Sequence, residues 1–174
     1  FYIGAALNKS EFYERNPKAG EVIGKHFNAA VAENDMKSMF LQPSEGEFFF
    51  KDADRFVEYA ENNGMYITGH TLVWHSQAPD WFFVDEHGEE VSREVLIDRM
   101  RNHIHTVVRR YRGRIGGWDV VNETILDDGQ WRQSPFVRII GEDFVQLAFR
   151  FAHEADPEAE LYYNDYSMTF EGRR

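Results

Sequence analysis

The sequence predicts an α/β fold, a (β/α)8 barrel of which this chain covers about the first five βα units. Short apolar runs alternate with segments of helical periodicity, which is typical of βα units. Polar or charged residues follow the last apolar position of each run, where barrels and open doubly wound sheets both place their functional groups. The turn after the first run, residues 8–11, contains no glycine, and neither a GxGxxG motif nor a P-loop occurs. This pattern favours the barrel over a nucleotide-binding open sheet.

Five strands are expected, at residues 2–7, 27–32, 65–74, 117–122 and 161–163. Helices are expected between them, at residues 11–26, 52–63, from 93 onward and 142–155. Pro17 interrupts or delimits the first helix, and Asp52 and Ser92 are the expected N-caps of the second and third. Apolar residues recur in the third helix at steps of three and four: Leu96, Met100, Ile104, Val107, Val108 and Tyr111.

The composition is that of one globular domain, with 43% hydrophobic and 28% charged residues among 174. No apolar run approaches the roughly 18 residues of a membrane span. The net charge of -11 disfavours nucleic acid as a partner, and the absence of cysteine excludes thiol nucleophiles and thiolate metal sites. Because a full barrel needs about 250 residues, we expect residues 1–174 to lack the C-terminal part of the barrel.

Motifs for several common chemistries are missing. His103 and His105 lie two positions apart on an expected helix, point to different sides and are interpreted as surface histidines. His70 and His75 lie at a strand end without the HExxH pattern of a zinc site. No GxSxG elbow supports serine catalysis, and the glycines at 113–117 precede a strand instead of following one, which weakens any phosphate cradle. No metal ion or other cofactor is expected.

Glu123 is the carboxylate that remains, at the end of a buried strand beside Asn122, with Trp74 and Trp118 on neighbouring or nearby strands. A carboxyl group in a dry, aromatic site is disfavoured in its charged form, which suits a general acid. Polar side chains able to hold sugar hydroxyls occur at other strand ends: Glu33, Asn34, Lys37, His70 and Gln77. From the residues alone, glycosidase chemistry and an ordinary set of capping and core residues both remain open.

Five segments carry a resemblance to a known family. They read FNAAVAENDMK, GHTLVWHSQAPDW, RYRGRIGGWDVVNE, IGEDFVQLAF and ADPEAELYYNDY, in this order along nearly the whole chain. They resemble successive blocks of the family 10 glycoside hydrolases, the endo-β-1,4-xylanases with a (β/α)8 barrel. The resemblance implies that residues 1–174 are an incomplete catalytic domain of this family, holding strands one to five. It also implies a secreted, periplasmic or cell-surface location, although no signal peptide is evident in this sequence.

The resemblance assigns roles to residues that match the family's blocks. It implies that Glu123 is the general acid/base and that Asn122 holds the 2-hydroxyl of the sugar being cleaved. His70 and Trp74 are implied to line the same subsite. Four polar side chains are implied to bind the next sugar toward the non-reducing side: Glu33, Asn34, Lys37 and Gln77. Two residues after the fifth strand are implied to face the leaving-group side: Asn164 and Tyr166.

Two positions depart from the family's pattern. Ser38 stands where the family usually has Trp, so packing beneath that subsite is expected to differ. The family's nucleophile is a Glu on the seventh strand in a TELD-like block, and no Glu of this chain matches it. We therefore expect the nucleophile to lie outside this chain, and assign that role to neither Glu33 nor Glu142.

The expected function is that of an endo-1,4-β-xylanase that hydrolyses xylan or xylo-oligosaccharides with retention of configuration, once the barrel is complete. Two alternatives stay open. The chain could belong to a catalytically inactive xylan-binding fragment, or to a relative that acts on β-1,4-glucan.

Overall fold

The computed structural model describes residues 1–169, which form one five-stranded parallel sheet. The strands are β1 (Gly4–Leu7), β2 (Ala29–Ala32), β3 (Tyr66–Trp74), β4 (Gly117–Asn122) and β5 (Glu160–Asn164). Their spatial order is β1-β2-β3-β4-β5, so each strand pairs with the next one along the chain. A doubly wound sheet reverses its strand order at a switch point, whereas a barrel does not. The predicted first five strands of a barrel are therefore confirmed.

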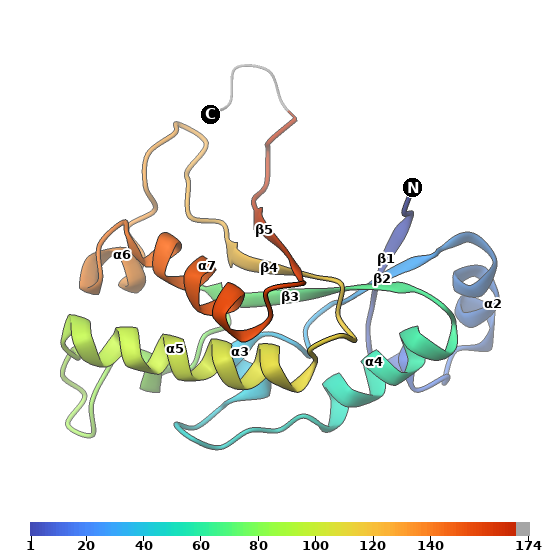
Figure 1. Cartoon of the computed structure of the whole chain (residues 1–174), viewed down its shortest axis with the longest axis horizontal. Coiled ribbons are helices and arrows are strands. Elements are labelled where there is room, and N and C mark those ends of the chain that lie inside the picture. The colour runs from blue at the N-terminus through green and yellow to red at the C-terminus, as the bar shows by residue number, and fades with distance from the viewer. Residues whose placement is uncertain (170–174) are drawn as a thin grey trace.

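Helices lie between the strands: α1 (Lys9–Phe12), α2 (Pro17–His26), α3 (Ser38–Leu41), α4 (Lys51–Asn62), α5 (Arg93–Arg110), α6 (Pro135–Ile139) and α7 (Phe144–Ala155), with a 3-10 turn η1 (Asp80–Phe82). Figure 1 shows α4 and α5 along the same side of the long strand β3. Helix α7 packs on α5 and on β4. None of the helices within residues 1–169 combines the length and apolar character needed to cross a membrane.

The core lies between the sheet and these helices. The apolar residues of α5 that recur at three- and four-residue steps are all buried: Leu96, Met100, Ile104, Val107 and Val108. Each such side chain contributes about 1.5–3 kcal/mol when it leaves water. The Ser92 side chain accepts a hydrogen bond from the Val95 amide, which confirms it as the N-cap of α5.

Several helix boundaries differ from the sequence-based expectation. The helix expected at residues 11–26 is divided, because α1 ends at Phe12 and Asn16 caps a new helix that starts at Pro17. Asp52 is not an N-cap, since α4 begins at Lys51 after Phe50. The Asp52 carboxylate instead accepts a hydrogen bond from Tyr13 at 2.6 Å and pairs with a lysine of α1. The Asp52 carboxylate therefore bonds to distant side chains instead of capping the first turn of α4. The short elements α3, η1 and α6 were not expected, because a few residues show no periodicity.

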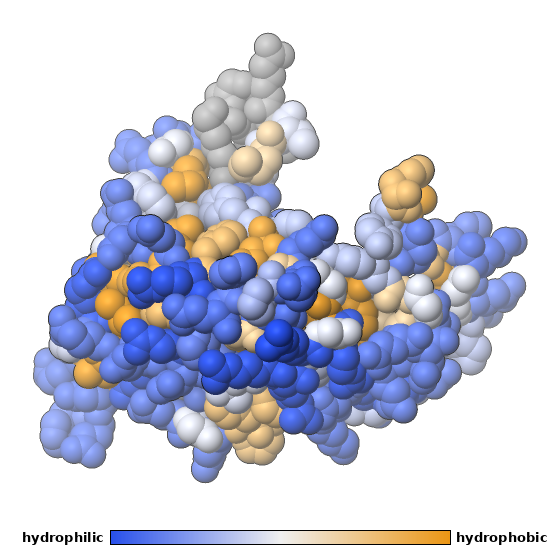
Figure 2. All heavy atoms as spheres, in the orientation of Figure 1, coloured by the Kyte–Doolittle hydropathy of each residue, from blue (hydrophilic) through white to orange (hydrophobic). Residues whose placement is uncertain are grey.

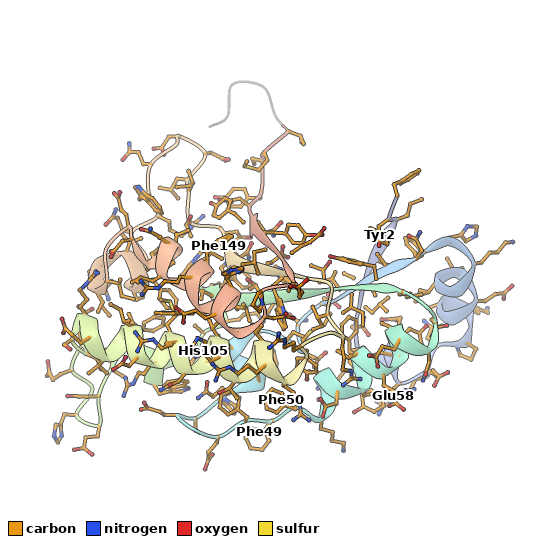
Figure 3. The ribbon with its side chains drawn as sticks, viewed as in Figure 1. Tyr2, Phe49, Phe50, Glu58, His105 and Phe149 are labelled. Atoms are coloured by element: carbon orange, nitrogen blue, oxygen red, sulfur yellow. The ribbon has the colours of Figure 1, made fainter. Side chains whose placement is uncertain are left out.

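The interpretation of His103 as a surface residue is wrong. His103 is 1% exposed, and its Nδ1 lies 2.9 Å from Oε1 of Gln42. The rings of Phe48 and Phe82 lie against it, at centroid distances of 6.2 and 5.5 Å. His105, labelled in Figure 3, is half-buried on another side of α5 and pairs with a glutamate of α7. Helix α5 is covered from two sides, which its own sequence pattern does not reveal.

Tyrosines from alternate strands meet on the face of the sheet opposite the helices. Tyr2, just before β1, stacks on Tyr66 of β3 with ring centroids 4.4 Å apart. Tyr2 is labelled in Figure 3, close to the start of the chain. The Tyr66 hydroxyl lies 3.2 Å from that of Tyr162 on β5. Side chains that reach across an intervening strand require a curved sheet, and barrels fill their interior with layers from alternate strands. The face with these tyrosines therefore corresponds to the barrel interior.

Candidate active site

The expected site residues lie at one edge of the sheet, because all five strands run in parallel and end there. Trp74 is the last residue of β3, Asn122 of β4 and Asn164 of β5. Glu33 follows β2, and its amide donates to the carbonyl of Leu7 at the end of β1. This is the edge at which barrel enzymes place their active sites.

Glu123 leaves β4 in a left-handed backbone conformation, with φ of 55°. Such a conformation is unfavourable for a residue with a side chain and persists only where neighbours hold it. The Glu123 amide donates to the carbonyl of Asn164 at 3.0 Å. The indole Nε1 of Trp74 donates to its carboxylate at 3.1 Å. The strands on the two sides of β4 thus hold Glu123, β3 by its half-buried carboxyl group and β5 by its main-chain amide.

Asn122 and Asn164 contact each other directly. The Asn164 side-chain amide donates to Oδ1 of Asn122 at 2.9 Å, and Asn122 is 2% exposed. The contact fixes the orientation of the buried Asn122 side chain at the end of β4.

A second group forms around Lys37, which is 8% exposed. Its Nζ donates to Oδ1 of Asn34 at 2.9 Å and to Oε1 of Gln77 at 2.7 Å, and lies 5.0 Å from the centre of the Trp74 ring. Gln77 also donates to Asn34 at 3.3 Å. Two segments that are distant in the sequence, one after β2 and one at the end of β3, therefore present a cation, two amides and an aromatic face together.

The charge of Lys37 is balanced by nearby carboxylates. Burial lowers the pKa of Lys37 from its ordinary value, whereas the negative charges of Glu33 and Glu123 oppose that shift. The opposing effects link the Lys37 group electrostatically to the carboxylate at the end of β4. Glu33 itself is exposed.

His70 lies on β3 four residues before Trp74 and pairs with a residue that sequence reasoning missed. Its Nδ1 lies 2.8 Å from Oδ2 of Asp119, and the two residues are also register partners on β3 and β4. The His70 ring lies 6.4 Å from that of Trp74. The peptide bond after His70 is cis, and the register between β3 and β4 shifts directly after it. Asp119 stands inside the segment RYRGRIGGWDVVNE, but only the strand register places it beside the histidine.

Tyr166, which is expected on the leaving-group side, is 38% exposed and contacts Arg132, another residue that sequence reasoning missed. Nη2 of Arg132 donates to the Tyr166 hydroxyl at 2.8 Å, and its Nε donates to the main-chain carbonyl of Glu123 at 2.9 Å. No sequence signal marks Arg132, since it lies in the loop between β4 and α6 outside every recognised segment.

Two further positions bear on the expectations. Trp118 is 1% exposed, and its ring packs 6.4 Å from that of Tyr111 at the end of α5. It belongs to the core, so its expected place beside Glu123 is wrong. The alternation of side chains along β4 turns it to the helix side.

Ser38, where the family usually has Trp, is 6% exposed and its hydroxyl donates to the carbonyl of Gln77 at 3.4 Å. This contact joins the start of α3 to the Lys37 group.

The family model described as glycosyl hydrolase family 10 matches residues 1–174. The chain belongs to glycosyl hydrolase family 10. Endo-1,4-beta-xylanase A of Xylanibacter ruminicola is 56% identical over 174 residues, which are 100% of this chain and 47% of that relative. The chain thus spans about half the length of this family 10 relative.

Solved structures of family 10 agree with the fold. An endoxylanase retrieved from a sugarcane soil metagenome superposes with a TM-score of 0.91 at 46% identity, over 96% of this chain and 49% of that chain. The intracellular xylanase of Thermoanaerobacterium saccharolyticum, solved as a mutant in complex with xylotriose, superposes with a TM-score of 0.91 at 45% identity. That match covers 96% of this chain and 54% of the other.

Proposed function

We propose that this chain is the N-terminal part of the catalytic domain of a retaining endo-1,4-β-xylanase, with Glu123 as its general acid/base. One observation carries the proposal. A half-buried carboxyl group at the end of β4 accepts a hydrogen bond from Trp74. The Lys37 ammonium group lies over the ring of the same tryptophan. The relative named as an endo-1,4-beta-xylanase and the related xylanase bound to xylotriose support xylan or xylo-oligosaccharides as the substrate.

Retaining hydrolysis uses two carboxyl groups about 5–5.5 Å apart on opposite sides of the sugar. In this proposal Glu123 protonates the leaving oxygen while the second carboxylate attacks the anomeric carbon and forms a glycosyl–enzyme intermediate. Glu123 then takes a proton from the water that hydrolyses the intermediate. The second carboxylate comes from the family's seventh strand, outside this chain.

The remaining side chains bind the sugars. Asn122 holds the 2-hydroxyl of the sugar being cleaved, a contact that strengthens in the oxocarbenium-like transition state. His70, oriented by Asp119, lines the same subsite. The Lys37 group, together with Glu33, hydrogen-bonds the next sugar toward the non-reducing end, while Trp74 offers an apolar ring face. Asn164 and Tyr166 lie on the leaving-group side.

Replacing Glu123 tests its assignment in the complete protein. Glu123→Ala is expected to lower kcat for xylo-oligosaccharides by about 10²–10⁴-fold, the usual contribution of a general acid. Dinitrophenyl xylobioside needs little protonation of its leaving group, so its cleavage to the glycosyl–enzyme is expected to slow far less. Steady-state and burst kinetics on both substrates measure the difference. Equal losses on both would remove Glu123 from the role of acid.

The same assays separate the alternatives. Release of reducing sugar from xylan by the unaltered complete protein, in excess of release from carboxymethyl-cellulose, supports the xylanase. The reverse preference supports the β-1,4-glucan-active relative. Xylan binding without hydrolysis of either polymer supports the inactive binding protein.

A further inference from the structure

The side chain of Arg132 connects the proposed acid, Glu123, to Tyr166. It lies in the loop between β4 and α6, nine residues after Glu123. Its guanidinium donates through Nε to the main-chain carbonyl of Glu123 at 2.9 Å and through Nη2 to the hydroxyl of Tyr166 at 2.8 Å. Its carbon Cζ also lies 5.9 Å from the centre of the Tyr166 ring. One planar group thus touches the acid residue and the aromatic residue of the leaving-group side.

The carbonyl contact matters because of the backbone at Glu123. This residue has φ of 55°, and its amide is held by the carbonyl of Asn164. Arg132 holds the carbonyl at the other end of the same residue, so both main-chain polar groups of Glu123 are fixed. Removing the guanidinium releases one of these restraints and allows the peptide after Glu123 to rotate. The carboxyl group then moves relative to the leaving oxygen.

The loop that carries Arg132 is held in turn to β5 through Thr124. The amide of Arg132 donates to the carbonyl of Thr124 at 2.8 Å, and the Thr124 hydroxyl donates to that of Tyr163 at 3.0 Å. The guanidinium therefore starts from an anchored main chain. The planar guanidinium, carried on an anchored main chain, can therefore hold the Glu123 carbonyl and the Tyr166 hydroxyl at fixed positions.

We propose that Arg132 is a positioning residue, which aims the Glu123 carboxyl group at the leaving oxygen and couples that aim to the leaving-group subsite through Tyr166. The inference rests on the proposed xylanase function for its kinetic consequences. A displacement of about 1 Å in a catalytic group costs on the order of 10²-fold in rate. The loss belongs to the step that needs proton donation, not to binding of the sugars on the non-reducing side.

The kinetic test uses the complete protein and compares Arg132→Met with Arg138→Met. Arg138 lies on α6 and pairs with Glu90 on the surface, so its replacement is the matched control. For Arg132→Met we expect kcat on xylotetraose to fall about 10–100-fold, with little change in the formation of the glycosyl–enzyme from dinitrophenyl xylobioside. Arg132→Lys keeps the charge but has one nitrogen for two acceptors, and is expected to restore little of the rate. Equal losses on both substrates, or full rescue by Lys, overturn the positioning role.

A second measurement does not depend on activity. Amide hydrogen exchange in residues 123–131 is expected to accelerate at least several-fold in Arg132→Met and to stay unchanged in Arg138→Met, because the carbonyl restraint is lost. Unchanged exchange in Arg132→Met overturns the inference even if xylan is hydrolysed. If the unaltered complete protein does not hydrolyse xylan, the proposed function fails, and the exchange result still decides whether Arg132 holds Glu123.

Discussion

Several polar side chains of the site form hydrogen bonds with neighbouring site residues. Trp74 donates to the Glu123 carboxylate while its ring lies beside Lys37. Lys37 in turn donates to Asn34 and Gln77. These contacts restrict the side chains before any ligand binds, and a restricted site loses less conformational entropy on binding. At the scale of residues, the site is therefore held in shape by its own members.

His103 links stability to pH at the same scale. Burial lowers the pKa of His103 from 6.5 to about 4, and within residues 1–169 its Nε2 has no hydrogen-bond partner. The unfolded chain binds this proton more readily, so the contribution of His103 is fully present above its unfolded pKa. The contribution is lost as pH falls from about 6.5 toward 4.

We predict that protonation of this one group lowers the free energy of unfolding by about 2 kcal/mol when the pH falls from 7.5 to 5. His103→Asn has no titrating ring and is expected to flatten that part of the pH dependence. Chemical denaturation of both forms of the complete protein at the two pH values measures the change. A His103 titration midpoint above 6 by NMR contradicts the prediction.

At the scale of elements, the close pairing of β3 with β4 depends on a glycine. A Cβ atom added to Gly69 on β3 would lie 2.1 Å from the ring of Trp118 on β4, and that ring is almost fully buried. Neither the ring nor the strand can move without disturbing the core beneath α5. Gly24, on the exposed side of α2, has no atom within 4 Å of such a Cβ.

The two glycines are therefore expected to respond in opposite directions to alanine. Gly69→Ala overpacks the core and is expected to destabilise the complete protein by at least about 1–3 kcal/mol. Gly24→Ala is expected to stabilise it by up to about 1 kcal/mol, because alanine favours the helix. Urea denaturation of the two variants measures both. Similar effects from the two changes would show that Trp118 can be displaced at little cost.

At the scale of the whole molecule, β1 and β5 each pair with one strand only within residues 1–169. Their outer edges present main-chain donors and acceptors of the kind that another strand satisfies. Apolar side chains are exposed at the start of the chain, at Phe1 and Ile3. Figure 2 shows hydrophobic atoms at this end of a mostly hydrophilic face. Both edges are the places where the rest of a family 10 barrel would join.

Residues 1–174 produced alone are expected to hydrolyse xylan at less than about 1% of the rate of the complete protein, because a retaining mechanism needs the second carboxylate. They are also expected to self-associate through the open edges. Reducing-sugar release and light scattering, with and without the C-terminal remainder of the barrel, measure both effects. Full activity of the fragment alone would mean that the nucleophile lies within these residues.

Local sequence patterns were sufficient to predict the strands, the buried face of α5 and the family. Apolar runs placed all five strands to within two residues at their ends, and β4 was predicted to the residue. The spacing of apolar residues predicted the buried face of α5, and long motifs identified family 10. These properties depend on neighbours along the chain or on recognisable segments, so one sequence carries them.

Contacts across the sheet were decided only by the tertiary structure. The His70–Asp119 pair needs the register of β3 on β4, and the bridge from Arg132 to Tyr166 joins residues 34 positions apart. Trp118 and His103 turned out to be core residues because helices and loops cover them from sides that their own segments do not specify. A hydrogen bond or a burial state depends on which distant groups the fold brings within reach, and local periodicity contains no such information.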